Sequence, residues 1–134
     1  MDKANSRQTL QKSIVFNALH SLKGHLRAED IFESIHKDFS QISRSTVFRI
    51  LGELVKQKKL LCLHVPYGAL RYDLRTDEHW HFQCKNCMRI FDVPKTKHLQ
   101  PPKMEEMPNF EVDECSVVYL GLCDKCLAKA KKAK

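Results

Sequence analysis

Apolar residues recur at helical spacing in the first part of the chain and predict three short helices. The first covers Arg7–Leu22, where apolar positions three or four residues apart form a stripe that ends before Gly24. A second is expected over Ala28–Lys37, and a third, capped by Ser43, runs to about Gln57. The residues expected to face the core are Leu10, Ile14, Val15, Ala18, Leu19, Leu22, Ala28, Ile31, Phe32, Ile35, Val47, Ile50, Leu51 and Leu54. Three helices with tight connections predict a helix-turn-helix core.

Two β-like runs follow the helices. They are Leu60–Val65 and Ala69–Leu74, and the Pro66-Tyr67-Gly68 segment between them has the composition of a hairpin turn. A helix-turn-helix core closed by a hairpin is a winged helix. We therefore assign residues 1–74 to a winged-helix domain and the polar residues 75–78 to a linker.

The rest of the chain, residues 79–134, changes to cysteine, histidine and strand-forming residues. Strands are predicted at His79–Cys84, Ile90–Val93 and Glu111–Leu120, with a segment of uncertain form at Lys95–Met107. The tail from Lys125 holds five lysines and is expected to be a frayed, solvated helix end. The predicted fold class is therefore α+β, with a helical first domain and a mixed second domain.

The charge is positive and unevenly distributed. The formal net charge is +7, and residues 1–74 carry 12 Lys/Arg against 7 Asp/Glu. Lysine and arginine release counterions when they bind phosphates, so the first domain is the better candidate for contact with nucleic acid. No apolar run of membrane-spanning length and no signal-peptide pattern is seen, and we expect a cytoplasmic protein.

Two C-x-x-C pairs are the strongest chemical signal. Cys84 and Cys87 form the first pair, and Cys123 and Cys126 form the second. Together they supply four thiolates, the ligand set of a tetrahedral structural zinc. Two redox-active dithiols, or coincidence, are the alternatives. The remaining cysteines, Cys62 and Cys115, are expected to be small buried residues.

A second group of candidate ligands contains no sulfur. His79 and His81 are two residues apart on a predicted strand, so their imidazoles share a face, and Asp73 and Asp92 are close in sequence. Imidazole with carboxylate suits iron, manganese or zinc. A histidine pair on a strand is also common as a purely structural feature, so the residues alone leave both interpretations open.

The predicted third helix carries a polar face opposite its apolar stripe. Ser45, Arg49, Gly52 and Lys56 lie on that face, with Arg44 and Phe48 on its flank. Serine and arginine near a helix N-terminus can reach phosphates and base edges in the major groove of DNA. Phe48 could equally serve as packing at the rim.

Several stretches together resemble the ferric uptake regulator family. They are Arg7–Lys12 (RQTLQK), Ile42–Leu51 (ISRSTVFRIL), Arg71–Asp73 (RYD), His79–Cys87 (HWHFQCKNC) and the final Cys123-x-x-Cys126. The resemblance covers nearly the whole chain. It implies a homodimer in which each subunit joins a winged helix to an α/β dimerisation domain and binds an inverted-repeat DNA operator when metallated. The implied DNA contacts are Arg44, Ser45, Thr46, Phe48 and Arg49.

Within that family the chain looks most like the peroxide-sensing regulators. The resemblance implies that His25, Asp73, His79, His81 and Asp92 hold a regulatory Fe(II) or Mn(II), while the four cysteines hold structural zinc. It further implies that hydrogen peroxide oxidises His25 or His79 and thereby releases DNA. A further His/Glu metal site, to which His98 or Glu105 would contribute, is not clearly indicated.

Three other functions compete with peroxide sensing. A regulator of iron, manganese or zinc homeostasis would use the same ligands, because nitrogen and oxygen donors accept several divalent metals. A small non-haem iron enzyme would use two histidines and a carboxylate, but no substrate motif accompanies them. A zinc-stabilised DNA-binding module that senses nothing would bind its operator without the second metal.

Overall fold

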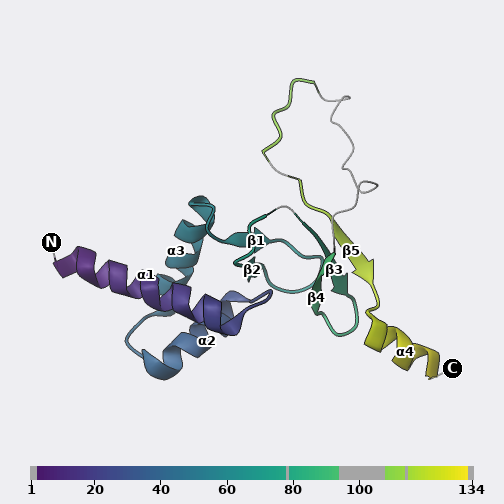
Figure 1. Ribbon diagram of the computed structural model, residues 1–134, viewed down its shortest axis with the longest axis horizontal. Coiled ribbons are helices and arrows are strands. Elements are labelled where there is room, and N and C mark those ends of the chain that lie inside the picture. The colour runs from purple at the N-terminus through teal and green to yellow at the C-terminus, as the bar shows by residue number, and fades with distance from the viewer. Residues whose placement is uncertain (1–2, 78, 94–107, 114, 133–134) are drawn as a thin grey trace. The chain divides into compact units, whose positions relative to one another are not determined.

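The computed structural model describes residues 3–77, 79–93, 108–113 and 115–132. Their helices are α1 (Lys3–Leu22), α2 (Ala28–Asp38), α3 (Arg44–Lys56) and α4 (Asp124–Lys132), and their strands are β1 (Leu61–Leu63), β2 (Arg71–Asp73), β3 (Trp80–Cys84), β4 (Ile90–Val93) and β5 (Val118–Gly121) (Figure 1). The predicted α+β class is confirmed. His98, Glu105 and the Lys95–Met107 segment lie outside the described residues.

The chain divides into two compact units. The first contains Met1–Val65 and Ala69–Thr76, and the second contains Pro66–Gly68 and Asp77–Lys134. In the part of the chain that the structure describes, no helix is both long and apolar enough to span a membrane.

Helices α1, α2 and α3 pack on one another in the first unit (Figure 1). Their shared core is aliphatic, and Val15, Ile31, Val47, Ile50 and Leu51 are fully buried in it. The stripe predicted for α3 is confirmed. Ser43 caps this helix as expected, because its side-chain oxygen accepts a hydrogen bond from the Thr46 N–H.

Helix α1 differs from its prediction at both ends of the apolar stripe. It begins at Lys3 rather than Arg7, since no proline or glycine interrupts the segment before Arg7. Leu10 is 62% exposed and Leu22 is 39% exposed, so neither is a core residue. The part of α1 that packs into the core lies between them, from Ile14 to Leu19.

The hairpin strands are shorter than predicted. β1 and β2 pair antiparallel over only three residues each, with Cys62 opposite Tyr72. Cys62 is half-buried. An additional backbone bridge joins Leu26 to Tyr72, through N–H···O bonds of 2.9 and 2.6 Å, so the loop before α2 extends this sheet.

The second unit is built on a sheet with strand order β4-β3-β5, in which β3 pairs antiparallel with β4 and parallel with β5. The prediction of a strand over Glu111–Leu120 is wrong for most of that range. Among the described residues of the range, only 118–120 form a strand, as part of β5 (Val118–Gly121). The short β3 explains this, because its pairing with β5 runs only from His81 to Cys84. Cys115 precedes the paired segment and is exposed, so the prediction of a buried cysteine is also wrong.

The second unit also contains the turn Pro66–Gly68. The Gln83 side chain is fully buried and exchanges two hydrogen bonds with the backbone of Tyr67. The Tyr67 N–H donates to Gln83 Oε1 at 2.9 Å, and Gln83 Nε2 donates to the Tyr67 carbonyl at 2.7 Å. These two bonds compensate for burying an uncharged amide. Sequence reasoning did not identify this contact.

Candidate metal centres and DNA-recognition helix

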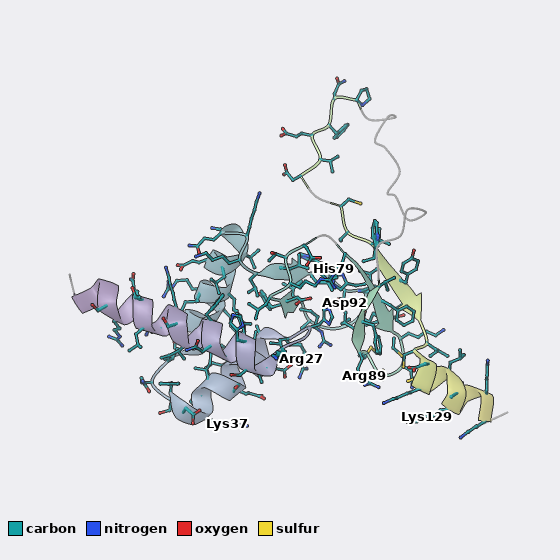
Figure 2. All side chains as sticks on the ribbon, viewed as in Figure 1. Arg27, Lys37, His79, Arg89, Asp92 and Lys129 are labelled. Atoms are coloured by element: carbon teal, nitrogen blue, oxygen red, sulfur yellow. The ribbon has the colours of Figure 1, made fainter. Side chains whose placement is uncertain are left out.

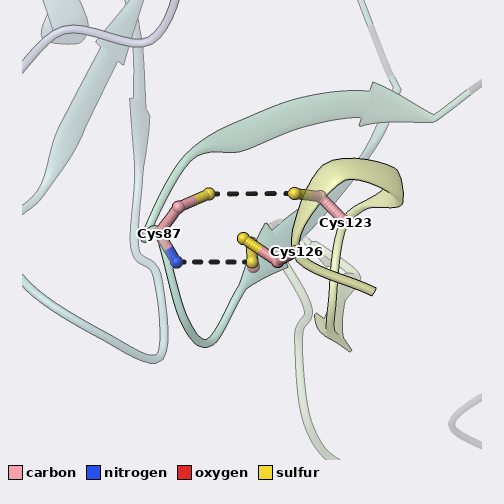
Figure 3. Close-up of side chains that lie close together, drawn as sticks. Cys87, Cys123 and Cys126 are labelled. Carbon is pink, nitrogen blue, oxygen red and sulfur yellow. Dashed lines mark hydrogen bonds between the residues drawn. The ribbon is translucent and has the colours of Figure 1, made fainter. Parts of the chain in front are cut away.

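The four cysteines of the two C-x-x-C pairs come together in the second unit, and Figure 3 shows three of them, Cys87, Cys123 and Cys126. Cys84 ends β3, Cys87 lies in the tight turn before β4, and Cys123 and Cys126 flank the start of α4. The turn is closed by the Met88 N–H donating to the Cys84 carbonyl at 3.0 Å. One ligand sulfur from each cysteine lies within 4.8 Å of the others.

The geometry of this cluster fits zinc. In a regular tetrahedron with zinc–sulfur bonds of about 2.3 Å, two sulfurs are about 3.8 Å apart. The Cys87 and Cys123 sulfurs are 3.8 Å apart, and all four residues are free thiols. A disulfide would bring two sulfurs to about 2 Å. A tetrahedral metal site therefore accounts for the sulfur arrangement better than a pair of dithiols does.

The thiol pKa values show how the protein environment differs around the cluster. Burial opposes ionisation of Cys84, but backbone N–H groups of Cys123 and Cys87 outweigh it and lower its pKa to about 6. The Asn86 amide, which donates to Cys126 Sγ at 3.4 Å, favours the Cys126 thiolate. Burial and the neighbouring sulfurs outweigh that bond and raise the Cys126 pKa to about 11. A bound zinc ion would displace the proton that a thiol with such a raised pKa retains, because zinc binds thiolates.

The first unit brings His25 and Asp73 together. His25 Nε2 lies 3.3 Å from Asp73 Oδ2, and both side chains are largely buried. The bridge between Leu26 and Tyr72 explains this proximity, because antiparallel pairing at these residues sets 25 opposite 73. The Arg71 guanidinium donates to the His25 carbonyl at 3.3 Å, and the Arg75 N–H donates to Asp73 Oδ1 at 3.0 Å. Sequence reasoning missed the supporting role of Arg71.

The second unit brings His79, His81 and Asp92 together, and Figure 2 shows His79 near Asp92. Asp92 lies on β4 directly opposite His81 of β3. Its Oδ1 atom is 3.0 Å from His79 Nε2 and 3.6 Å from His81 Nε2. The two imidazole nitrogens and the carboxylate oxygen therefore converge as a set of nitrogen and oxygen donors.

The hydrogen bond that orients the His79 ring also suits metal binding. Its Nδ1 atom lies 2.7 Å from the Asp77 carbonyl oxygen, which can only accept a hydrogen bond. Nδ1 therefore carries a proton, and in the neutral ring Nε2 keeps its lone pair. Metal-binding histidines commonly have this arrangement, since the bond at the second nitrogen fixes the ring orientation. These nitrogen and oxygen donors fit iron or manganese.

Helix α3 presents the residues that were predicted to contact DNA. Phe48 is 42% exposed, and the Arg44 and Arg49 side chains are 59% and 47% exposed. Arg44 pairs with Glu29 at 3.2 Å and lies over the Phe32 ring, while Arg49 pairs with Glu53 at 2.7 Å. Ser45 and Thr46 both contact the capping Ser43 hydroxyl. The face is thus polar, cationic and open to a ligand.

Residues 3–120 match the sequence profile of the ferric uptake regulator family. The chain belongs to the ferric uptake regulator family. Members are metal-responsive transcription regulators that bind DNA as dimers, so this protein is a regulator of that kind and not an enzyme. Zinc, and iron or manganese, are the metals of the family, and the two groups of ligands described above provide donors of the matching types.

Relatives within the family are named for two different roles, ferric uptake regulation and the response to peroxide. The ferric uptake regulation protein 2 of Mycolicibacterium fortuitum is 30% identical over 92% of this chain and 87% of its own length. The peroxide-responsive repressor PerR of Staphylococcus aureus is 27% identical over 94% of this chain and 86% of its own. The Campylobacter jejuni peroxide stress regulator superposes with a TM-score of 0.69 at 25% identity, covering 92% of this chain and 94% of the other.

Proposed function

We propose that this protein is a cytoplasmic, peroxide-responsive repressor whose homodimer binds an inverted-repeat operator in its metallated form. The observation that carries the proposal is the split ligand set. One unit provides the pair His25 and Asp73, and the other provides His79, His81 and Asp92. Two or three ligands do not fill the coordination shell of iron or manganese, whereas five nearly do.

We further propose that a single ion binds all five ligands. Only five residues separate Asp73 from His79 in the sequence, so the chain can extend at most about 20 Å between them. An ion held from both units would restrict their relative motion. It would thereby select one arrangement of the two winged helices of a dimer, and an operator that binds this arrangement would be bound more tightly.

The ligands themselves provide the peroxide response in this proposal. Ferrous iron held by these ligands would supply the redox catalysis, with no net change in its own oxidation state, through which hydrogen peroxide oxidises an adjacent imidazole. In the net reaction the ring of His25 or His79 gains one oxygen atom from peroxide in a two-electron oxidation, and one water is released. An oxidised ring binds metal differently from imidazole, so its ligand bond weakens and the two units are released from each other.

The test uses the protein loaded with zinc and Fe(II), with manganese-loaded protein as the control. Its DNA probe is a duplex that the manganese-loaded protein selects from a random-sequence pool. Peroxide should abolish binding by the iron form and add one oxygen atom to the peptide carrying His25 or His79. The manganese form should keep both its DNA affinity and its peptide masses. Unaltered histidines in the iron form, with DNA binding set only by metal concentration, would instead identify a metal-homeostasis regulator.

A ligand variant tests the split site directly. Replacing His79 and His81 together by alanine should remove metal-dependent DNA binding and leave the zinc content at the cysteines unchanged. His36→Ala, at an exposed imidazole on α2, is the matched control and should behave like the unmodified protein. Undiminished metal-dependent DNA binding in the double variant would disprove the shared site.

A further inference from the structure

Glu53 binds two cations at once on the exposed face of α3. Its Oε1 atom accepts a hydrogen bond from Arg49 Nη1 at 2.7 Å, and its Oε2 atom lies 3.3 Å from Lys12 Nζ of α1. Arg49 and Glu53 are four residues apart, which places their side chains on the same helical face. The three groups carry a net charge of +1. All three side chains are at least one-third exposed, so they can reach a ligand that docks on this face.

Glu53 is ionised near neutral pH. Its pKa is lowered first by the hydrogen bond from Lys12 and then by the one from Arg49. The carboxylate therefore places a fixed negative charge within a helix face that is otherwise cationic. A DNA phosphate that approaches Arg49 or Lys12 must compete with this carboxylate and is repelled by it.

A base edge meets a different situation. Arginine has five N–H donors in a rigid planar fork, and the Glu53 bond uses a donor on Nη1. The Nη2 and Nε donors stay available for the O6 and N7 acceptors of guanine. Because one side of the fork is already held by Glu53, the guanidinium loses less rotational freedom when it binds a base.

We propose that Glu53 is a specificity-determining residue, which orients Arg49 toward a guanine edge in the major groove and disfavours sequence-independent contact with phosphates. This inference rests on the proposed operator binding. It assigns Glu53 a role that differs from simple surface pairing, because an exposed ion pair by itself contributes little to stability. Lys12 makes the orientation of Arg49 depend on the packing of α1 against α3.

The test measures affinity for two duplexes by the zinc- and manganese-loaded protein. One duplex is selected by the unmodified protein from a random pool, and the other has the same composition in scrambled order. Glu53→Gln removes the negative charge. Binding to the scrambled duplex should tighten, its logarithmic salt dependence should steepen by about one unit, and the ratio of the two affinities should fall about tenfold.

Two controls separate specificity from charge. Glu33→Gln makes the same charge change at an exposed position of α2, and it should raise both affinities alike and leave their ratio intact. In an Arg49→Ala background, Glu53→Gln should leave the ratio unchanged within about twofold, because the residue that it orients is missing. An unaltered ratio for Glu53→Gln alone would overturn this inference while operator binding stands. If the unmodified protein selects no sequence, operator binding and this inference both fail.

Discussion

The two units of this chain are stabilised by different kinds of buried contact. Among the described residues, the core of the first unit contains ten valine, leucine and isoleucine side chains. The corresponding cluster of the second unit contains Cys84, Cys123 and Cys126, with Phe82, Phe91 and Leu122 packed against it. Burial of aliphatic surface stabilises the first unit whether or not a metal is present. The described residues of the second unit bury little such surface, so we expect bound zinc to supply much of the stability of this unit.

The two groups of candidate metal ligands differ in a parallel way. All four cysteines belong to one unit and are mostly buried, and four thiolates complete a tetrahedron without leaving an open position. The histidines and aspartates are divided between the units, and their nitrogen and oxygen donors discriminate less strongly among divalent metals. The first arrangement suits a permanent structural ion, whereas in the proposed function the second would hold an ion whose occupancy changes.

Loss of zinc is expected to have the largest effect. Replacing Cys84 and Cys126 by serine should unfold the second unit, since a structural zinc in a small domain contributes on the order of 10 kcal/mol of folding free energy. The helical signal of the first unit should persist in circular dichroism, and proteolysis should cut mainly after residue 76. Cys115→Ser, at an exposed cysteine, is the control and should retain zinc and fold normally. Simultaneous loss of all helical signal would refute the difference between the units.

The next effect concerns the aliphatic core. Ile50→Ala should lower the free energy of unfolding by about 2–5 kcal/mol, because Ile50 is fully buried and its truncation leaves a cavity. Zinc content should not change, since the cluster belongs to the other unit. Leu10→Ala, at a 62% exposed position, should change stability by less than about 0.5 kcal/mol. Urea denaturation measures the free energy of unfolding of each variant, and metal analysis measures its zinc content. Loss of zinc from Ile50→Ala would show that the units are not independent.

The parts of this structure that the sequence predicted depend on local signals. Apolar spacing predicted α2 and α3, Ser43 predicted the cap, and the C-x-x-C pairs predicted the sulfur cluster. His79 and His81 were identified because alternate residues of a strand share a face. The convergence of Asp92 on them follows from its register opposite His81.

The features that the sequence did not predict depend on partners far along the chain. The strand over Glu111–Leu120 was predicted too long because its length depends on pairing with β3, whose residues lie 37 positions before their β5 partners in the sequence. Gln83 resembles an ordinary polar strand residue until its contact with the Tyr67 backbone is known. Without the family resemblance, no local pattern indicated His25, because its position opposite Asp73 requires the backbone bridge at Tyr72.

A smaller effect is expected at the buried amide of the second unit. Gln83→Met keeps a side chain of similar length but removes both hydrogen bonds to Tyr67, leaving a partly buried N–H and carbonyl without these bonds. The free energy of unfolding of the zinc-loaded protein should fall by about 1–3 kcal/mol. Gln57→Met, at an exposed glutamine, is the control. An unchanged urea midpoint for Gln83→Met would mean that the metal alone governs the stability of this unit.

The smallest effect is expected at the cap of α3, in the unit that is stabilised without metal. Ser43→Ala removes the oxygen that accepts the Thr46 N–H at 3.2 Å, and this should lower the free energy of unfolding by about 1 kcal/mol. Ser13→Ala, whose hydroxyl donates to the Thr9 carbonyl within α1, is the control and should be nearly neutral. The loss at Ser43 should be the same with and without zinc, because a local backbone contact in the aliphatic unit does not depend on the sulfur cluster. A loss seen only in the zinc-loaded protein would show that the metal also stabilises the first unit, and the contrast between the units would then be one of degree.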